Sequence, residues 1–156
     1  MMDPNSSEVK IVRLTAADVG VVSDLLCDFL NELADGKSHT LEELQPVARH
    51  LIEEKLIIGA IAYIDHEPAG LILLNECAAI YAGGCFGEIT ELYVVPKYRS
   101  HGVAVHLIPE AKLIAQERSW KRFEVGAPDQ PAWERTLKFY LREGFEEVGP
   151  RLRLLL

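Results

Sequence analysis

A glycine-bearing loop between a predicted strand and a predicted helix is the segment best suited to chemistry. It reads Arg99-Ser100-His101-Gly102-Val103-Ala104, shortly after Pro96. The first N–H groups of a helix lack intrahelical partners and the helix dipole adds positive potential, so an anion such as a pyrophosphate can dock there. Gly102 and Ala104 let a phosphate approach the backbone, and Arg99 can add charge-assisted hydrogen bonds. Taken alone, the pattern also fits an ordinary strand-to-helix turn.

The elements that must position this loop begin with a short strand and a helix. Residues 9–14 form a β-branched run, and Thr15 with Asp18 resembles a capping box that opens a helix. Gly36 suits the left-handed position that closes it. Its apolar stripe, at helical spacing, is Val22, Leu25, Leu26, Phe29 and Leu33.

A second helix follows. Thr40 and Glu43 form another capping box, which predicts a helix through about Glu54 with a bend at Pro46. Its predicted apolar stripe is Leu41, Leu44, Val47 and Leu51.

The middle of the chain changes to the alternation and β-branched composition of strands. Residues 56–64 and 69–80 predict an antiparallel hairpin around a turn at 65–68, and a loop at 81–84 leads to a strand over 86–95 that Pro96 stops.

Helical periodicity resumes at about Val103 and ends near Arg118, with Leu107, Ala111, Ile114 and Ala115 on one side. The remaining predicted elements are a strand within 122–127, a helix from Pro131 to Arg142 before Gly144, and one or two final strands over 145–148 and 151–156. The order β α α β β β α β α β is an α/β mixture whose sheet is mixed but mostly antiparallel.

Composition excludes several classes of protein. The 156 residues suit one domain, predicted over 1–156 with a flexible tail at 1–8. The net charge of −8 disfavours nucleic-acid binding, and no apolar stretch is long enough for a membrane helix. The three cysteines, Cys27, Cys77 and Cys85, show neither disulfide nor zinc spacing, which suits a reducing cytoplasm. No histidine spacing indicates a metal site, so no metal is expected.

Two stretches, ELYVVPKYRSHGVA and KFYLREGF, resemble the GNAT superfamily of N-acetyltransferases. The resemblance implies the GNAT fold, with helices flanking the central sheet, and acetyl-CoA as co-substrate. It further implies that pantetheine pairs with the backbone of Leu92, Tyr93 and Val94. The pyrophosphate would then be held by Arg99 and by the N–H groups of Ser100, His101, Gly102, Val103, Ala104 and Val105.

The same resemblance supplies candidates for proton transfer. Tyr140 matches the family's general acid, and a phenol with a pKa near about 10 is protonated at neutral pH. Glu88 and Glu91 are candidate bases, acting directly or through water. An odd separation would place them on opposite faces of a regular strand, whereas a bulge would change that parity. No nucleophile and base pattern accompanies Cys85, so direct attack in a ternary complex is expected rather than a covalent acyl-enzyme.

Three residues depart from the family pattern. Pro109 lies about two turns into the predicted helix, where it removes a hydrogen bond and predicts a kink or a loosened first turn. Trp133 and Thr136 stand where many relatives have Asn and Ala, so Trp133 is expected to pack either on the pantetheine arm or in the core.

The acceptor is the least determined part. The resemblance is closest to small-amine acetyltransferases, including aminoalkylphosphonate N-acetyltransferases. Polyamines, aminoglycosides, amino acids and peptide N-termini stay open, and acidic residues on the first helix, Asp28, Glu32 and Asp35, are either a solvated face or an attraction for a cationic acceptor. A catalytically silent acetyl-CoA sensor and a purely structural domain are the alternatives, and a homodimer is possible.

Overall fold

The computed structural model describes residues 7–33, 39–128 and 130–156. The helices and strands follow one another as β1 (Val9–Arg13), α1 (Val19–Leu33), α2 (Leu41–Glu53), β2 (Ile58–Ile64), β3 (Glu67–Ala79), β4 (Gly84–Val94), α3 (Val103–Glu117), β5 (Phe123–Val125) and α4 (Glu134–Arg142). Two short 3₁₀ turns, η1 (Ala16–Asp18) and η2 (Pro96–Tyr98), precede α1 and α3.

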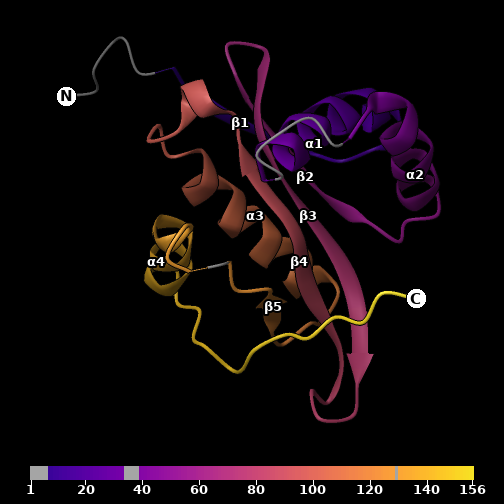
Figure 1. The fold of residues 1–156 in the computed structure, drawn as a ribbon, viewed down its shortest axis with the longest axis vertical. Coiled ribbons are helices and arrows are strands. Elements are labelled where there is room, and N and C mark those ends of the chain that lie inside the picture. The colour runs from indigo at the N-terminus through magenta and orange to yellow at the C-terminus, as the bar shows by residue number, and fades with distance from the viewer. Residues whose placement is uncertain (1–6, 34–38, 129) are drawn as a thin grey trace.

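The strands form one sheet in the order β1-β2-β3-β4-β5. The first three pairings are antiparallel and the pairing of β4 with β5 is parallel. In Figure 1, α1 and α2 cover one face of the sheet, while α3 covers the other and α4 lies beside it. The prediction of a mixed, mostly antiparallel sheet flanked by helices is confirmed.

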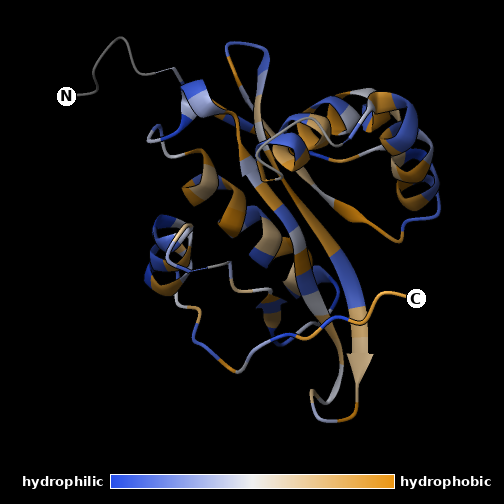
Figure 2. Cartoon of the chain, viewed as in Figure 1, coloured by the Kyte–Doolittle hydropathy of each residue, from blue (hydrophilic) through white to orange (hydrophobic). Residues whose placement is uncertain are grey.

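Alternation along β3 divides the core into two layers. Ile72 and Leu74 pack on the α3 side, and Leu71 and Leu73 pack on the side of α1 and α2. Figure 2 shows the apolar residues concentrated along the central strands and on one side of α3. The predicted stripe of α3 is correct, since Leu107, Ala111, Ile114 and Ala115 are all buried.

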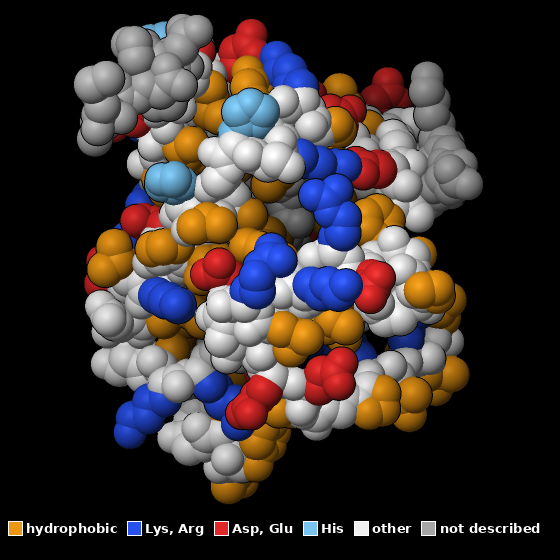
Figure 3. All heavy atoms as spheres, turned by 90° about the vertical axis from the view of Figure 1, so that its left-hand side faces the viewer, with side chains coloured by type: hydrophobic (Ala, Val, Ile, Leu, Met, Phe, Trp, Pro, Cys, Tyr) orange, Lys and Arg blue, Asp and Glu red, His pale blue; other side chains and the backbone are white. Residues whose placement is uncertain are grey.

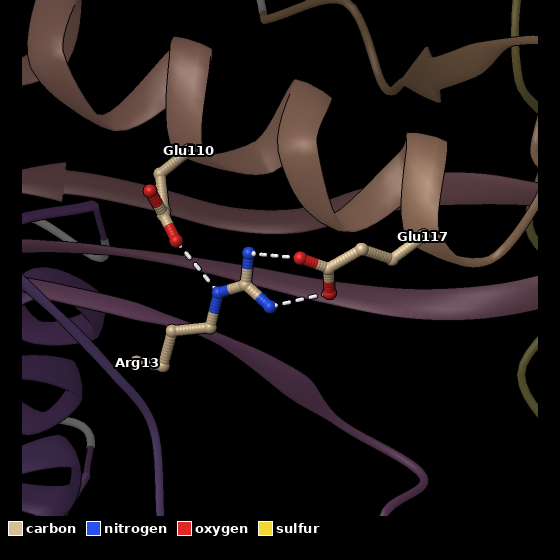
Figure 4. Close-up of polar contacts among 3 residues, drawn as sticks. All are labelled: Arg13, Glu110 and Glu117. Carbon is tan, nitrogen blue, oxygen red and sulfur yellow. Dashed lines mark hydrogen bonds and ion pairs between the residues drawn. The ribbon is translucent and has the colours of Figure 1, made fainter.

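Arg13 fastens β1 to α3 by an ion-pair cluster (Figure 4). Its Nε lies 2.6 Å from Oε1 of Glu110, and its two terminal nitrogens contact the carboxylate of Glu117 at 2.6 and 2.9 Å. The forked geometry of the guanidinium matches a carboxylate well. Because α3 begins at the predicted anion loop, this cluster helps to fix the helix on which that loop depends.

The predicted final strands are wrong. The segment 143–156 forms no helix or strand, and Leu152, Leu154, Leu155 and Leu156 are exposed. A strand needs a neighbour for its N–H and C=O groups. The sheet ends at β5, which has only three residues, and Gly149 (φ 136°) with Pro150 interrupts the segment. Five strands are therefore described, and the element order ends with α4.

Among the smaller predictions, some are confirmed and others are wrong. Both capping boxes are present. The stripe of α2 is partly wrong, because Leu41 and Val47 are exposed and Ile52 is the buried residue. The helix expected at Pro131 begins at Glu134. The expected closure of α1 at Gly36 lies outside the described residues, as do most residues of the predicted tail at 1–8.

Prolines do not interrupt the helices that contain them. Both α2, with Pro46, and α3, with Pro109, are continuous elements. The first turn of α3 is intact, since the His106 N–H donates to the Gly102 carbonyl at 3.1 Å. The loosened first turn expected from Pro109 is therefore not found.

Candidate active site

A bulge in β4 brings the two candidate bases to one face of the sheet. Leu73 lies opposite Glu91 and Leu74 lies opposite Ile89, so Thr90 is the extra residue. Glu88 lies opposite Asn75, two positions along β3 from Leu73. Residues two apart on a strand share a face. Glu88 and Glu91 therefore face the α1 side together, whereas an uninterrupted strand would have separated them.

The sheet forks next to this bulge. β5 pairs with β4 only from Gly87 to Ile89, and beyond that point no described strand occupies this edge of β4. Leu92 and Val94 pack toward α3, and Tyr93 is buried toward α1 and stacks on Phe29 at 5.2 Å. The side chains of residues 92–94 thus pack in the core on the two faces of the sheet. The backbone of these residues is therefore the part that faces the fork.

A cleft of about 910 Å³ occupies the fork. Among its lining residues are nearly all the predicted site residues, namely Glu88, Glu91, Leu92, Tyr93, Val94, Arg99, Ser100, Gly102, Val103, Ala104, Val105 and Tyr140. His101 is the exception. Its side chain is exposed, with Nδ1 3.0 Å from the Arg99 carbonyl and its ring edge-on to Tyr98.

The start of α3 has the features of an anion site. Gly102 precedes the helix with φ 77°, a left-handed conformation that glycine adopts without steric cost. No side chain caps this helix. The N–H groups of Val103, Ala104 and Val105 cannot have intrahelical partners, and all three residues line the cleft. A diphosphate would satisfy them.

Arg99 lies at the cleft but is partly engaged by the protein. Its Nε donates to the Val94 carbonyl at 3.0 Å, and its Nη2 lies 2.8 Å from Oε2 of Glu32 on α1. The bond to Glu32 raises the pKa of Arg99. An incoming phosphate would share the remaining guanidinium donors or displace Glu32.

Tyr140 is buried on α4 yet its hydroxyl remains available. Its ring packs against Phe139 and Phe145 with centroid distances of 5.6 and 5.3 Å. Within the described residues, the hydroxyl has no hydrogen-bond partner, and no fully buried polar side-chain atom is left unpaired. The oxygen therefore keeps some exposed surface, and Tyr140 is among the residues that line the cleft. Burial raises the pKa of Tyr140 to about 12, so the phenol stays protonated at neutral pH.

The two glutamates have different surroundings. Burial raises the pKa of Glu91, the hydrogen bond from the Thr90 hydroxyl opposes this, and the negative charge of Glu88 raises it further. Glu88 instead has a cationic partner, since Nη1 of Arg151 lies 2.9 Å from its Oε1. The Cys77 thiol contacts the other oxygen at 3.7 Å.

Sequence reasoning missed part of the lining. Arg135, Lys138 and Arg142 on α4 line the cleft, and Figure 3 shows Lys and Arg side chains gathered about the middle of this face. Their i, i+3, i+7 spacing indicates one helix face and could have revealed them. Trp133 and Thr136 also line the cleft, so Trp133 belongs to the cleft wall rather than to the core clusters.

Other kinds of site are absent from the described part of the chain. No cluster of histidine, cysteine and carboxylate side chains there could hold a metal ion. No helix there is long and apolar enough to cross a membrane. All three cysteines are free thiols.

A forked mixed sheet, an uncapped helix start and a buried tyrosine lie along one cleft. Comparisons with known proteins show the family to which a chain with these features belongs. Residues 47–147 match the family model described as the Acetyltransferase (GNAT) domain. The chain therefore belongs to the GNAT acetyltransferase family. It is 29% identical over 108 residues to the thialysine N-epsilon-acetyltransferase of Caenorhabditis elegans, an alignment that covers 65% of this chain and 64% of that protein's length.

Solved structures share the fold. An aminoglycoside acetyltransferase from an uncultured soil metagenomic sample is 20% identical with a TM-score of 0.79, over 96% of this chain and 99% of that one. A Clostridium acetobutylicum protein described as a predicted acetyltransferase with acetyl-CoA is 17% identical with a TM-score of 0.77, over 95% of this chain and 96% of that one.

Proposed function

We propose that this chain transfers the acetyl group of acetyl-CoA to a primary amine of a small molecule, by direct attack of the amine in a ternary complex. One observation carries the proposal. A single cleft joins the uncapped start of α3, the unpaired edge of β4 and the free hydroxyl of Tyr140. These supply, in order, donors for a diphosphate, donors and acceptors for an extended amide arm, and a proton for a leaving thiolate.

The residues of this chain divide the work as follows. The N–H groups of Ser100 and of Gly102 to Val105 bind the diphosphate, with Arg99 beside them, and the backbone of residues 92–94 orients the pantetheine arm. The His101 N–H donates instead to the Tyr98 carbonyl at 3.3 Å. Bound acetyl-CoA supplies the thioester. Tyr140 donates its phenolic proton to the departing sulfur. Glu91 or Glu88 takes the proton that the attacking ammonium must lose, directly or through water, because only a neutral amine is nucleophilic.

The cleft carries both signs of charge, with Arg135, Lys138 and Arg142 on α4, but its α1 side is acidic and favours a cationic acceptor. Glu32, Glu88 and Glu91 line it on the α1 side, whereas Arg49 pairs with Glu53 away from it. A phosphonate would require cations near the reacting amine. Polyamines, aminoglycosides and amino-acid side-chain amines fit better, the last in keeping with the name of the C. elegans relative. The cytoplasmic location, the single domain and the homodimer remain predictions.

The test combines binding and turnover. Calorimetry on nucleotide-free protein should show acetyl-CoA binding, and an amine screen with a polyamine, an aminoglycoside, lysine and an aminoalkylphosphonate should show thiol release. Binding without thiol release for any amine would favour a silent sensor module. Absence of binding, and of any thermal shift at saturating acetyl-CoA, would reject the proposal.

A further inference from the structure

The carboxylate of Glu88 already pairs with a cation of this chain. Arg151 lies in the segment after α4, and its Nη1 is 2.9 Å from Oε1 of Glu88. The same nitrogen lies over Gly126, just beyond the end of β5, where an added Cβ would be 3.6 Å away. Among the described residues, Arg151 is the cation that pairs with this carboxylate. The guanidinium therefore sits at the mouth of the fork on the acceptor side.

The Arg151 side chain is less firmly held by the rest of the protein than the Glu88 carboxylate that it contacts. Its side chain is 60% exposed, whereas that of Glu88 is 22% exposed. The segment 143–156 contributes no helix or strand, so no backbone ladder fixes Arg151 in place. An ion pair whose cation is exposed and lies on an irregular segment gains little stability. A ligand cation can replace this guanidinium without disturbing the sheet.

Glu88 and Glu91 place two carboxylates on one face of the sheet, some distance apart along β4. Glu88 and Glu91 face the same side, opposite Asn75 and Leu73. Two residues along β3 correspond to about 7 Å between Cα atoms, which sets the scale of the spacing between the two glutamates opposite them. One carboxylate can therefore serve a reacting amine while the other serves a second cationic group on the same extended molecule.

We propose that Glu88 is the docking point for a second positive charge on the acceptor, and that the acceptor displaces Arg151 from it. The inference rests on the proposed function and deepens it. Glu91 then takes the proton from the reacting nitrogen, while Glu88 selects acceptors with an ammonium or guanidinium group about 7 Å away. Diamines and basic amino acids have this form. Arg151 is a competitor built into the chain, and it neutralises Glu88 while the cleft is empty.

The test uses putrescine and n-butylamine, which differ in the second amine. Thiol release is measured for wild type, Arg151→Gln, Glu88→Gln and the control Arg153→Gln, which removes an exposed arginine of the same segment. Glu88→Gln should raise the KM for putrescine at least about tenfold more than the KM for n-butylamine, since a charge-assisted hydrogen bond is lost. Arg151→Gln should lower the KM for putrescine several-fold relative to Arg153→Gln.

Two results would overturn the inference. One is an equal loss of kcat with both amines in Glu88→Gln, which would make Glu88 the base. The other is an unchanged KM for putrescine in Arg151→Gln. Calorimetry of both amines on CoA-loaded protein separates this inference from the proposed function. Preferential binding of putrescine without thiol release would support the docking point and reject the transferase, whereas thiol release with equal KM for both amines would do the reverse.

Discussion

Glu32 on α1 holds Arg99 at the start of the anion loop, with 2.8 Å between Oε2 and Nη2. The pair joins the helix that borders the acceptor side to the loop proposed to bind the diphosphate. A carboxylate in this position competes with a phosphate for the same guanidinium donors. Cofactor binding should therefore be sensitive to Glu32, a residue of α1 that lies outside the anion loop.

Glu32→Gln should lower the Kd for CoA by about two- to fivefold, because partly exposed charge pairs contribute only modestly. Calorimetry measures the change, and Asp28→Asn is the matched control because it removes an exposed acidic charge one turn earlier on α1. Equal tightening in both variants would mean that only net charge matters. Weaker binding in Glu32→Gln would show that Glu32 positions Arg99 for the phosphate.

Tyr140→Phe should lower kcat by about 10² to 10⁴-fold while leaving the Kd for CoA unchanged, since only the proposed proton donor is removed. Tyr81→Phe removes an exposed hydroxyl outside the cleft and serves as the control. Because the pKa of Tyr140 is raised to about 12, the wild-type rate should show no alkaline loss from this group between pH 8 and about 10. Turnover near the wild-type value in Tyr140→Phe would remove the residue from the mechanism.

Glu91→Gln should slow acetyl transfer and yet stabilise the fold at neutral pH. Burial raises the pKa of Glu91, so the folded wild type binds this proton more tightly than the unfolded chain does. The stabilisation that comes from this tighter proton binding is full at acid pH and is lost as pH rises through the raised pKa of Glu91. At pH 7 Glu91 is therefore ionised and destabilises the fold. Urea unfolding at pH 7 and at about pH 4, near the pKa of an unfolded glutamate, measures it. An advantage of Glu91→Gln that persists unchanged at the lower pH would contradict the assignment.

Arg13→Gln should lower the melting temperature by a few degrees at most, because the Arg13 cluster is partly exposed. Arg13 lowers the pKa of Glu117. A lowered carboxyl pKa gives stability that is present above the unfolded value and is lost as pH falls through the folded value. The difference between variant and wild type should therefore shrink below about pH 4. Arg49→Gln, which breaks an exposed pair within α2, is the comparison and should cost less.

Much of the fold follows from local patterns. The hydrophobic alternation of β2, β3 and β4 and the capping boxes at Thr15 and Thr40 are written in neighbouring residues, and they were predicted. The final strands failed because pairing needs a distant partner that local alternation does not reveal. In the same way, Leu41 and Val47 match a helical stripe, but which face of α2 is buried depends on where α1 and the sheet lie.

The residues of the candidate site likewise divide into those that local sequence predicts and those that it does not. The loop from Arg99 to Ala104 carries its own evidence in glycine, small residues and a following helix. The contacts of Glu32 with Arg99 and of Arg151 with Glu88 join residues 67 and 63 positions apart. No short motif encodes such pairs. The bulge at Thr90 is an intermediate case between features that local sequence predicts and features that it does not. The sequence is compatible with a bulge there, but only the pairing register of β4 with β3 establishes it.

The early separation of β4 from β5 also bears on self-association. An unpaired strand edge is a template on which another molecule's strand can grow, and proteins commonly protect such edges with charge, prolines or coverage. Here the bare edge of β4 faces α4 across a recess instead of open solvent. The acetyl-CoA proposed to fill this recess would cover the same edge, so its binding would also guard against the addition of a foreign strand.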